Sequence, residues 1–302
     1  MAKDKEPKKK EDKEAPLSFK AKALAFLKET GIILGAFLLL NNFVVASFLV
    51  PTGSMENEVL TGDLLFVNKF IYGGTSPRNI PFTNVRLPWF RLPAIKSVER
   101  GDVIVFEFPG YREEVNPEEF QFYLKRCVGL PADTIRIIDR VLYVNGEPAP
   151  LPRNLKFSNP ARVPDTVSDE RIFPPGSGWN EDNYGPLVVP FAGMKVRLTG
   201  DTFRTWETFI RREGHQTWRV GEKIFVDGAP TSEYTVERDY LFGMGDHRDN
   251  SLDSRYWGFI PKENLVGSPI LVYWSWDTNI PLYNIFSRLG SIRWTRVGTL
   301  IR

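Results

Sequence analysis

Residues 31–50 read GIILGAFLLLNNFVVASFLV and contain no charged side chain. A helix needs about 20 apolar residues to cross the hydrocarbon core of a bilayer, which is the length of this stretch. Asn41 and Asn42 are unfavourable at its centre, but neutral amides are tolerable in so apolar a setting. The sequence therefore predicts a transmembrane anchor at 31–50, preceded by a charged tail at 1–30.

A cleavable signal peptide is the alternative for this segment. Its apolar region is normally shorter, and a small-residue cleavage site should follow. The residues around Ala46 make a poor site, and cleavage there would leave the new N-terminus beside Ser54. We therefore interpret the segment as an anchor. The nine lysines of the tail predict that the tail is cytoplasmic and that everything after Val50 lies outside.

Composition narrows the possible classes of protein. The 302 residues are 42% hydrophobic and 25% charged, as expected of a chain with a globular core. A net charge of +2, from scattered basic residues, does not indicate a nucleic-acid partner. A single cysteine, Cys127, excludes an internal disulfide. With His215 and His247 as the two histidines, we expect no metal site and no cofactor.

After Pro51 the sequence is typical of short β-strands. Runs rich in Val, Ile, Phe and Tyr are bounded by Gly or Pro, at 64–66, 102–108, 120–128 and 134–144. Asn145-Gly146 and Asp227-Gly228 each lie between apolar runs, which predicts two hairpins. Helical periodicity is weak beyond the anchor. The fold class is therefore mainly β: one N-terminal transmembrane helix followed by an external all-β domain.

The residues that directly follow the anchor include the first candidate for chemistry. Ser54, preceded by Gly53, lies where the chain must turn away from the membrane, and such a serine is either a nucleophile on a bend or an ordinary turn serine. The second candidate is Lys125. On a strand it shares a face with Tyr123 and Cys127, and burial there would lower its pKa toward that of a general base. An edge-strand lysine that reaches solvent is the alternative.

The third segment is the loop at 243–258, GMGDHRDNSLDSRYWG. It places charges of both signs and hydroxyl groups between glycines, as expected of a hydrogen-bonded loop that supports a site. A calcium loop is the competing interpretation. The arginines Arg248 and Arg255 among the would-be oxygen ligands, and the missing helix–loop–helix context, argue against it.

Together these segments carry a resemblance. Ser54-Met55, Gly62-Asp63 and the stretches 67–73, 100–106, 125–131 and 245–258 are similar, in order and spacing, to motifs of the bacterial type I signal peptidases (leader peptidases). The chain departs from the family pattern at Glu56, where proline commonly follows Met55, at His247, often asparagine, and at Leu252, often alanine. We expect Leu252 to narrow the substrate pocket.

The resemblance implies a catalytic β core at 51–140 and 237–302 and an inserted variable β region at 141–236. It also implies a role for each matching residue. Ser54 is the nucleophile and Lys125 the general base, and the oxyanion is held by Ser54 N–H and the Thr52 hydroxyl. Ser251 hydrogen-bonds and orients the lysine. The pair Asp253–Arg255 holds the loop in place. Shallow apolar pockets for small side chains are lined by Phe48, Val50, Met55, Val59, Tyr123, Leu124 and Leu252.

The implied activity is removal of signal peptides from secretory preproteins at the outer face of the cytoplasmic membrane, through an acyl-enzyme. The partners are these preproteins, the lipid bilayer and the secretion translocon. Trp89, Phe90, Trp274, Trp276 and Trp294 are candidates for the membrane interface or, equally, for the β core. A self-cleaving repressor of the Ser/Lys class, an inert tethered binding protein with this fold and a Ser/Lys peptidase with narrower substrates are the alternatives. The anchor, the absence of a helix-turn-helix ahead of Ser54, and the presence of both Ser54 and Lys125 argue against the first two.

Overall fold

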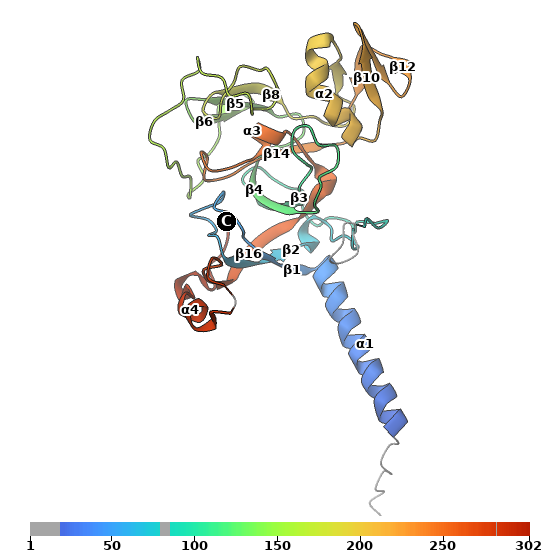
Figure 1. Ribbon diagram of the computed structural model, residues 1–302, viewed down its shortest axis with the longest axis vertical. Helices are drawn as coiled ribbons and strands as arrows, with labels where there is room; N and C mark the ends of the chain where they lie inside the picture. The colour runs from blue at the N-terminus through green and yellow to red at the C-terminus, as the bar shows by residue number, and fades with distance from the viewer. Residues whose placement is uncertain (1–18, 79–84, 282) are drawn as a thin grey trace, which may run out of the picture. The chain divides into compact units, whose positions relative to one another are not determined.

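The structure is a computed structural model that describes residues 19–78, 85–281 and 283–302. The chain divides into two compact units, and the division falls between Leu40 and Asn41 in the sequence. The first unit consists, within the described residues, of most of helix α1 (Phe19–Phe43). The second unit, from Asn41 to the last residue, contains every strand (Figure 1).

Helix α1 is long and apolar enough to cross a membrane over the segment Lys22–Phe43. This confirms one apolar helix near the N-terminus, but the predicted bounds of 31–50 are wrong at both ends. Residues 19–30 of the predicted charged tail belong to the helix, while its part at 1–18 lies outside the described residues. The helix ends at Phe43.

The last residues of the predicted anchor form a strand instead. Strand β1 (Val45–Leu49) pairs antiparallel with β2 (Asp63–Asn68), from Val45 opposite Asn68 to Leu49 opposite Leu64. Hydropathy could not separate the two elements, because a short apolar strand that directly follows an apolar helix extends the same hydrophobic run. Ser54 therefore follows a strand of the second unit and not helix α1 itself.

The main sheet has seven strands in the order β1-β2-β16-β3-β4-β14-β15. The chain enters it at β1, and the long strand β16 pairs with both β2 and β3 (Figure 1). Its further strands are β3 (Val103–Glu107), β4 (Phe122–Gly129), β14 (Tyr240–Met244), β15 (Ile260–Pro261) and β16 (Leu265–Ser275). The predicted strands at 64–66, 102–108 and 120–128 are thus confirmed with small shifts at their ends.

Three smaller sheets complete the β structure. A four-stranded sheet has the order β7-β6-β5-β8, a three-stranded sheet the order β10-β11-β12, and β13 pairs with β9. Their strands are β5 (Thr134–Ile138), β6 (Val141–Val144), β7 (Glu147–Pro148), β8 (Tyr184–Val188), β9 (Lys195–Arg197), β10 (Thr217–Val220), β11 (Lys223–Val226), β12 (Ala229–Pro230) and β13 (Glu233–Thr235).

Both predicted hairpins are confirmed. Asn145 and Gly146 connect β6 to β7 with φ values of 55° and 86°, and Asp227 and Gly228 connect β11 to β12 with φ values of 49° and 85°. Two successive residues in the left-handed region are the signature of the turn that matches the twist of a β-hairpin. The predicted strand at 134–144 is in fact the hairpin β5–β6, with a turn at Asp139 and Arg140.

The boundary drawn at residue 141 therefore divides a hairpin. Strand β5, on the core side of that boundary, pairs with both β6 and β8 on the other side. One cluster of buried side chains joins Val128 of β4 and Phe242 of β14 to Ile135 of β5 and Ile210 of the region 141–236. The structure accordingly gives no separate body to the region 141–236.

That region also contains a helix that we did not predict, α2 (Gly200–Arg212). Its N-terminus has a capping box between Thr199 and Thr202, which satisfies backbone N–H groups that have no partner within the helix. Phe203 and Ile210 are buried in the cluster described above. Two further short helices are α3 (Ser254–Trp257) and α4 (Ile285–Gly290). The second unit is mainly β, as predicted, but not entirely so.

Candidate active site

Ser54 lies on a tight turn between β1 and β2. The turn is closed by hydrogen bonds from Glu56 N to Gly53 O at 3.0 Å and from Val59 N to Met55 O at 2.9 Å. The Ser54 residue is only 9% exposed. Its backbone N–H has no hydrogen-bond partner among the described residues. The turn thus leaves both the hydroxyl and the backbone N–H of Ser54 available to a bound substrate.

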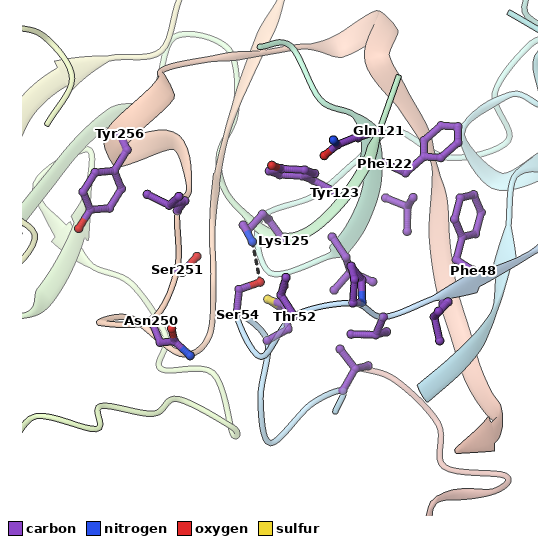
Figure 2. Close-up of a pocket in the computed structure, with 18 of the residues that line it drawn as sticks. Phe48, Thr52, Ser54, Gln121, Phe122, Tyr123, Lys125, Asn250, Ser251 and Tyr256 are labelled. Carbon is purple, nitrogen blue, oxygen red and sulfur yellow. Dashed lines mark hydrogen bonds between the residues drawn. The ribbon is translucent and has the colours of Figure 1, made fainter. Parts of the chain in front are cut away.

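Lys125 reaches Ser54 from the middle of β4. The Lys125 Nζ lies 2.7 Å from Ser54 Oγ, and the two side chains point toward each other in Figure 2. Lys125 is buried, and its Nζ lies 5.7 Å from the centre of the Tyr123 ring. The predicted neighbourhood of Tyr123 and Lys125 on one face of the strand is confirmed, and Lys125 is not an edge-strand lysine that reaches solvent.

Burial lowers the pKa of Lys125 from 10.5 to about 8. The main cause is desolvation, which penalises the charged ammonium. The carboxylate of Asp253 raises the pKa again, and the guanidinium of Arg255 lowers it. At slightly alkaline pH a substantial fraction of Lys125 is therefore deprotonated, and only the deprotonated amine can act as a general base.

The loop after β14 is held by the predicted pair of Asp253 and Arg255. Arg255 Nε and Nη2 each donate to the Asp253 carboxylate at 2.9 Å, and both side chains are almost fully buried. Asp253 Oδ2 also accepts a hydrogen bond from Gly245 N at 3.0 Å. One carboxylate thus joins the beginning of the loop to its end, which confirms the predicted ion pair.

A second buried pair was not predicted. Arg126, next to Lys125 on β4, donates from Nε and Nη2 to the two carboxylate oxygens of Asp246 at 2.8 and 2.6 Å. Two parallel charge-assisted bonds set the orientation as well as the distance. The pair fastens the strand that carries Lys125 to the loop. The alternation of side chains along β4 places Arg126 on the face opposite Lys125. This was the sequence signal from which a separate partner for Arg126 could have been expected.

The expected hydrogen bond from Ser251 to Lys125 is absent. Ser251 Oγ is buried without a hydrogen-bond partner. It lies over Gly245, where an added Cβ would be 2.3 Å from Ser251 Oγ and 2.5 Å from Ser54 O. Ser251 is therefore beside the Ser54–Lys125 pair but not bonded to the lysine. Gly245, which we had not singled out, is the residue that lets the loop approach the Ser54 turn.

A cavity of about 1030 Å³ opens on Ser54 and Lys125. All the residues predicted to contact substrate line it, together with Thr52 and Ser251: Phe48, Val50, Met55, Val59, Tyr123, Leu124 and Leu252. Met55 and Val59 are also fully buried in a hydrophobic cluster with Val50. The two interpretations of these three residues, pocket lining and core packing, are thus compatible, since the core forms the floor of the cavity.

Several lining residues were missed by the sequence analysis. They include Gln121 and Phe122 on one side of the Ser54–Lys125 pair, and Asn250 and Tyr256 on the other (Figure 2). Tyr256 had a signal available, since it lies inside the loop motif. Phe122 had none, because alternation along β4 assigns it to the face opposite Tyr123. Nothing in the sequence pattern marked Gln121.

The comparisons with known proteins agree with this geometry. The family model described as signal peptidase, peptidase S26, matches residues 23–274. The chain belongs to the signal peptidase family. Membership makes it an enzyme, a serine peptidase, and confirms the resemblance described above. Within the described residues, no group of three or more His, Cys, Asp or Glu side chains is arranged to hold a metal ion.

Individual relatives lie at moderate identity. The signal peptidase I of Pseudomonas aeruginosa is 31% identical over 274 residues, which cover 86% of this chain and 76% of that protein. The signal peptidase I of Rickettsia bellii is 30% identical over 272 residues, covering 86% of this chain and 79% of that protein. A solved signal peptidase I from Enterococcus faecalis is 22% identical and covers 58% of this chain and 98% of that one, with a TM-score of 0.27, too low for an inference about fold.

Proposed function

We propose that this enzyme removes N-terminal signal peptides from secretory preproteins, with Ser54 as nucleophile and Lys125 as general base. The observation that carries the proposal is the 2.7 Å contact between Lys125 Nζ and Ser54 Oγ, two buried side chains that line one cavity. The names of the relatives supply the substrate class, since they are signal peptidases of type I.

The reaction proceeds in two stages. Neutral Lys125 takes the proton of the Ser54 hydroxyl as Oγ attacks the carbonyl carbon of the scissile peptide bond. The ammonium then returns this proton to the leaving amine, which departs as the new N-terminus of the mature protein, and an ester on Ser54 remains. In the second stage Lys125 deprotonates a water molecule that attacks the ester. The signal peptide leaves as a carboxylic acid and Ser54 is regenerated.

The negative charge on the carbonyl oxygen requires hydrogen-bond donors. The Ser54 N–H without a partner is one, and the Thr52 hydroxyl, exposed at the same cavity, is the other. Each such donor contributes roughly 10²–10³ in turnover when preorganised. Ser251 lines the same cavity as the lysine, and its Oγ, which is buried without a hydrogen-bond partner among the described residues, is available to bond the lysine or a substrate.

Specificity follows from the apolar side of the cavity. Its floor is built from fully buried side chains such as Met55 and Val59, which cannot move aside without disturbing the core. Shallow pockets on a rigid floor admit alanine-sized side chains and exclude large ones by overlap. We propose that they receive the residues one and three positions before the cut.

We place the reaction at the outer face of the cytoplasmic membrane, with the N-terminus in the cytoplasm. Helix α1 supports the anchor, and the lysine-rich sequence before it supports the orientation. Phe90 and Trp294 are 59% and 68% exposed, which suits the headgroup region. Trp274 is partly buried and packs on both Trp276 and Trp294. The bilayer and the translocon as partners belong to this proposal.

The test uses the full-length enzyme in detergent with a secretory preprotein. We expect wild type to release the mature protein, and Ser54→Ala and Lys125→Met to abolish release while remaining folded. His215→Ala with His247→Ala should retain measurable cleavage. Intact preprotein with the wild type would favour an inert tethered binding protein. Normal cleavage by Ser54→Ala or Lys125→Met would refute the assignment of the pair.

A further inference from the structure

A segment of the long connection between β7 and β8 runs beside the loop after β14. Lys156 and His247 form an isolated parallel bridge between them. Lys156 N donates to Asp246 O at 2.9 Å, and Arg248 N donates to Lys156 O at 3.0 Å. The backbone at Lys156 is therefore fixed against the same loop that approaches Ser54.

Side chains of this segment, residues 154–159, reach the turn that carries Ser54. Lys156 Nζ lies 3.0 Å from Glu56 Oε2, and the Asn154 amide donates to the Glu58 carboxylate. Glu56 and Glu58 are the residues two and four positions after Ser54 in the sequence. The segment 154–159 thus contacts the nucleophile turn through charged and polar groups.

His247 lies between the segment and the turn. Its Nδ1 is 3.1 Å from Glu56 Oε2 and 3.3 Å from Gly53 O. Both are acceptors to which a protonated Nδ1 donates. Its Nε2 is 2.7 Å from Ser158 Oγ. The backbone N of His247 donates to Ser54 O at 3.1 Å. The His247 side chain is only 4% exposed, whereas its partners Glu56 and Ser158 lie closer to the surface.

We propose that Lys156, Ser158 and His247 are positioning residues for the nucleophile. They act through Glu56 and Gly53 to hold the turn, so that Ser54 Oγ stays within hydrogen-bonding distance of Lys125. The inference rests on the proposed role of Ser54. Its physical reason is that the turn has no strand or helix of its own and includes Asn57 at a φ of 79°. A nucleophile displaced by about 1 Å loses on the order of 10²-fold in rate.

One arrangement favours positioning over general packing. Glu56 Oε2 is held by two partners from different parts of the chain, Lys156 Nζ at 3.0 Å and His247 Nδ1 at 3.1 Å. The pKa of the Glu56 carboxyl is accordingly lowered, chiefly by the hydrogen bond from Lys156.

The chain offers matched controls for both residue types. Lys195 pairs with Glu233 at 2.8 Å in the same region of the chain but between two short strands. His215 lies between the carboxylates of Asp227 and Glu237. Neither pair contacts the nucleophile turn. A general effect of losing an ion pair or a histidine would appear equally in Lys195→Met and His215→Asn.

The experiment compares Lys156→Met and His247→Asn with Lys195→Met and His215→Asn in the full-length enzyme. We expect kcat on a preprotein to fall about threefold to tenfold in Lys156→Met and about tenfold in His247→Asn, with KM within about twofold. The controls should keep the wild-type kcat. Deuterium uptake of residues 53–59 should rise in the first two variants only. Ser158→Ala provides a third, milder change should His247→Asn fold poorly.

A double-mutant cycle completes the test. The double variant Glu56→Gln with His247→Asn should lose less kcat than the product of the two single losses, because both substitutions remove the same contact. Unchanged kcat and unchanged uptake at 53–59 in Lys156→Met and Ser158→Ala would overturn the inference, and so would equal losses in the controls. Failure of the proposed function is a different result, in which the wild type does not cleave. The uptake measurement then still decides whether the turn is held by Lys156.

Discussion

The carboxylate of Asp253 is engaged on both oxygens by Arg255, so its negative charge reaches Lys125 largely compensated. A bare carboxylate near a buried lysine would raise the lysine pKa and keep it protonated. The Asp253–Arg255 pair instead holds the loop rigid while leaving desolvation as the dominant influence on Lys125. One pair of residues thus supports the loop, while burial sets the proton affinity of Lys125.

The first prediction concerns the pH profile. A pKa of about 8 for Lys125 means that the base is mostly protonated below that pH and mostly neutral above it. We expect kcat/KM to rise with pH through an acidic limb near pH 8. The limb should shift little with ionic strength, because desolvation is not screened as exposed charges are. The measurement is kcat/KM between pH 6 and 10 at two salt concentrations.

The same profile in His247→Asn serves as the control. Its kcat is expected to be lower, but its acidic limb should coincide with that of the wild type. A limb near pH 6.5 that moves with this substitution would identify an imidazole base.

The second prediction concerns stability. The folded-state pKa of Lys125 is depressed from 10.5 to about 8, so between these pH values the unfolded chain holds more protons and the free energy of unfolding rises with pH. Below pH 8 the folded enzyme keeps a buried charge at a cost. We expect Lys125→Met to be more stable than wild type at pH 7 by about 1–3 kcal/mol, and the gain to shrink at pH 10. Melting in detergent at both pH values measures this.

Lys195→Met is the comparison, since Lys195 is exposed on the surface. It should show no comparable gain at either pH. A Lys125→Met enzyme that melts below the wild type at pH 7 would contradict a desolvation penalty at this position.

The third prediction concerns Gly245. A Cβ at this position would lie 2.5 Å from Ser54 O and 2.6 Å from Ser251 Cβ, so Gly245→Ala must separate the loop from the nucleophile turn. We expect kcat to fall at least tenfold and stability to fall by about 1–3 kcal/mol. Gly290→Ala is the matched control, because nothing lies within 4 Å of its added Cβ. Equal activity of the two variants would show that the close approach at Gly245 is unimportant.

The fourth prediction concerns substrate choice. Replacing the alanine one or three residues before the cut by phenylalanine should stop cleavage, because the pocket floor at Met55 and Val59 cannot yield. Leu252 lines the cavity and is half exposed. Shortening this side chain can therefore enlarge the pocket without disturbing the core. Leu252→Ala should therefore accept valine better than wild type does. Comparable rates on the alanine and phenylalanine substrates would refute the pocket assignment.

Local sequence signals located most of the secondary structure and failed where two elements share one pattern. The turns at Asn145-Gly146 and Asp227-Gly228 were predictable because few residues adopt a positive φ. The apolar run through Val50 could not be divided, because hydropathy is the same for the end of α1 and for β1. Helix α2 was missed although its signals were present: Phe203, Phe209 and Ile210 recur at helical spacing after the N-cap Thr199. Its stability depends on burial of Phe203 and Ile210 against distant strands.

The sequence by itself determined the family, the apolar N-terminal helix and the residue types of the site, because short motifs of fixed order record chemistry that tolerates few substitutions. Only the tertiary structure decided which of those residues touch. Ser54 and Lys125 lie 71 positions apart, and their contact depends on how β4, the Ser54 turn and the loop after β14 pack around Gly245. The contacts of Lys156 and His247 with Glu56, and the absence of a bond from Ser251 to Lys125, likewise depend on packing. Such distances are set by long-range pairing and burial, which no local pattern in the chain encodes.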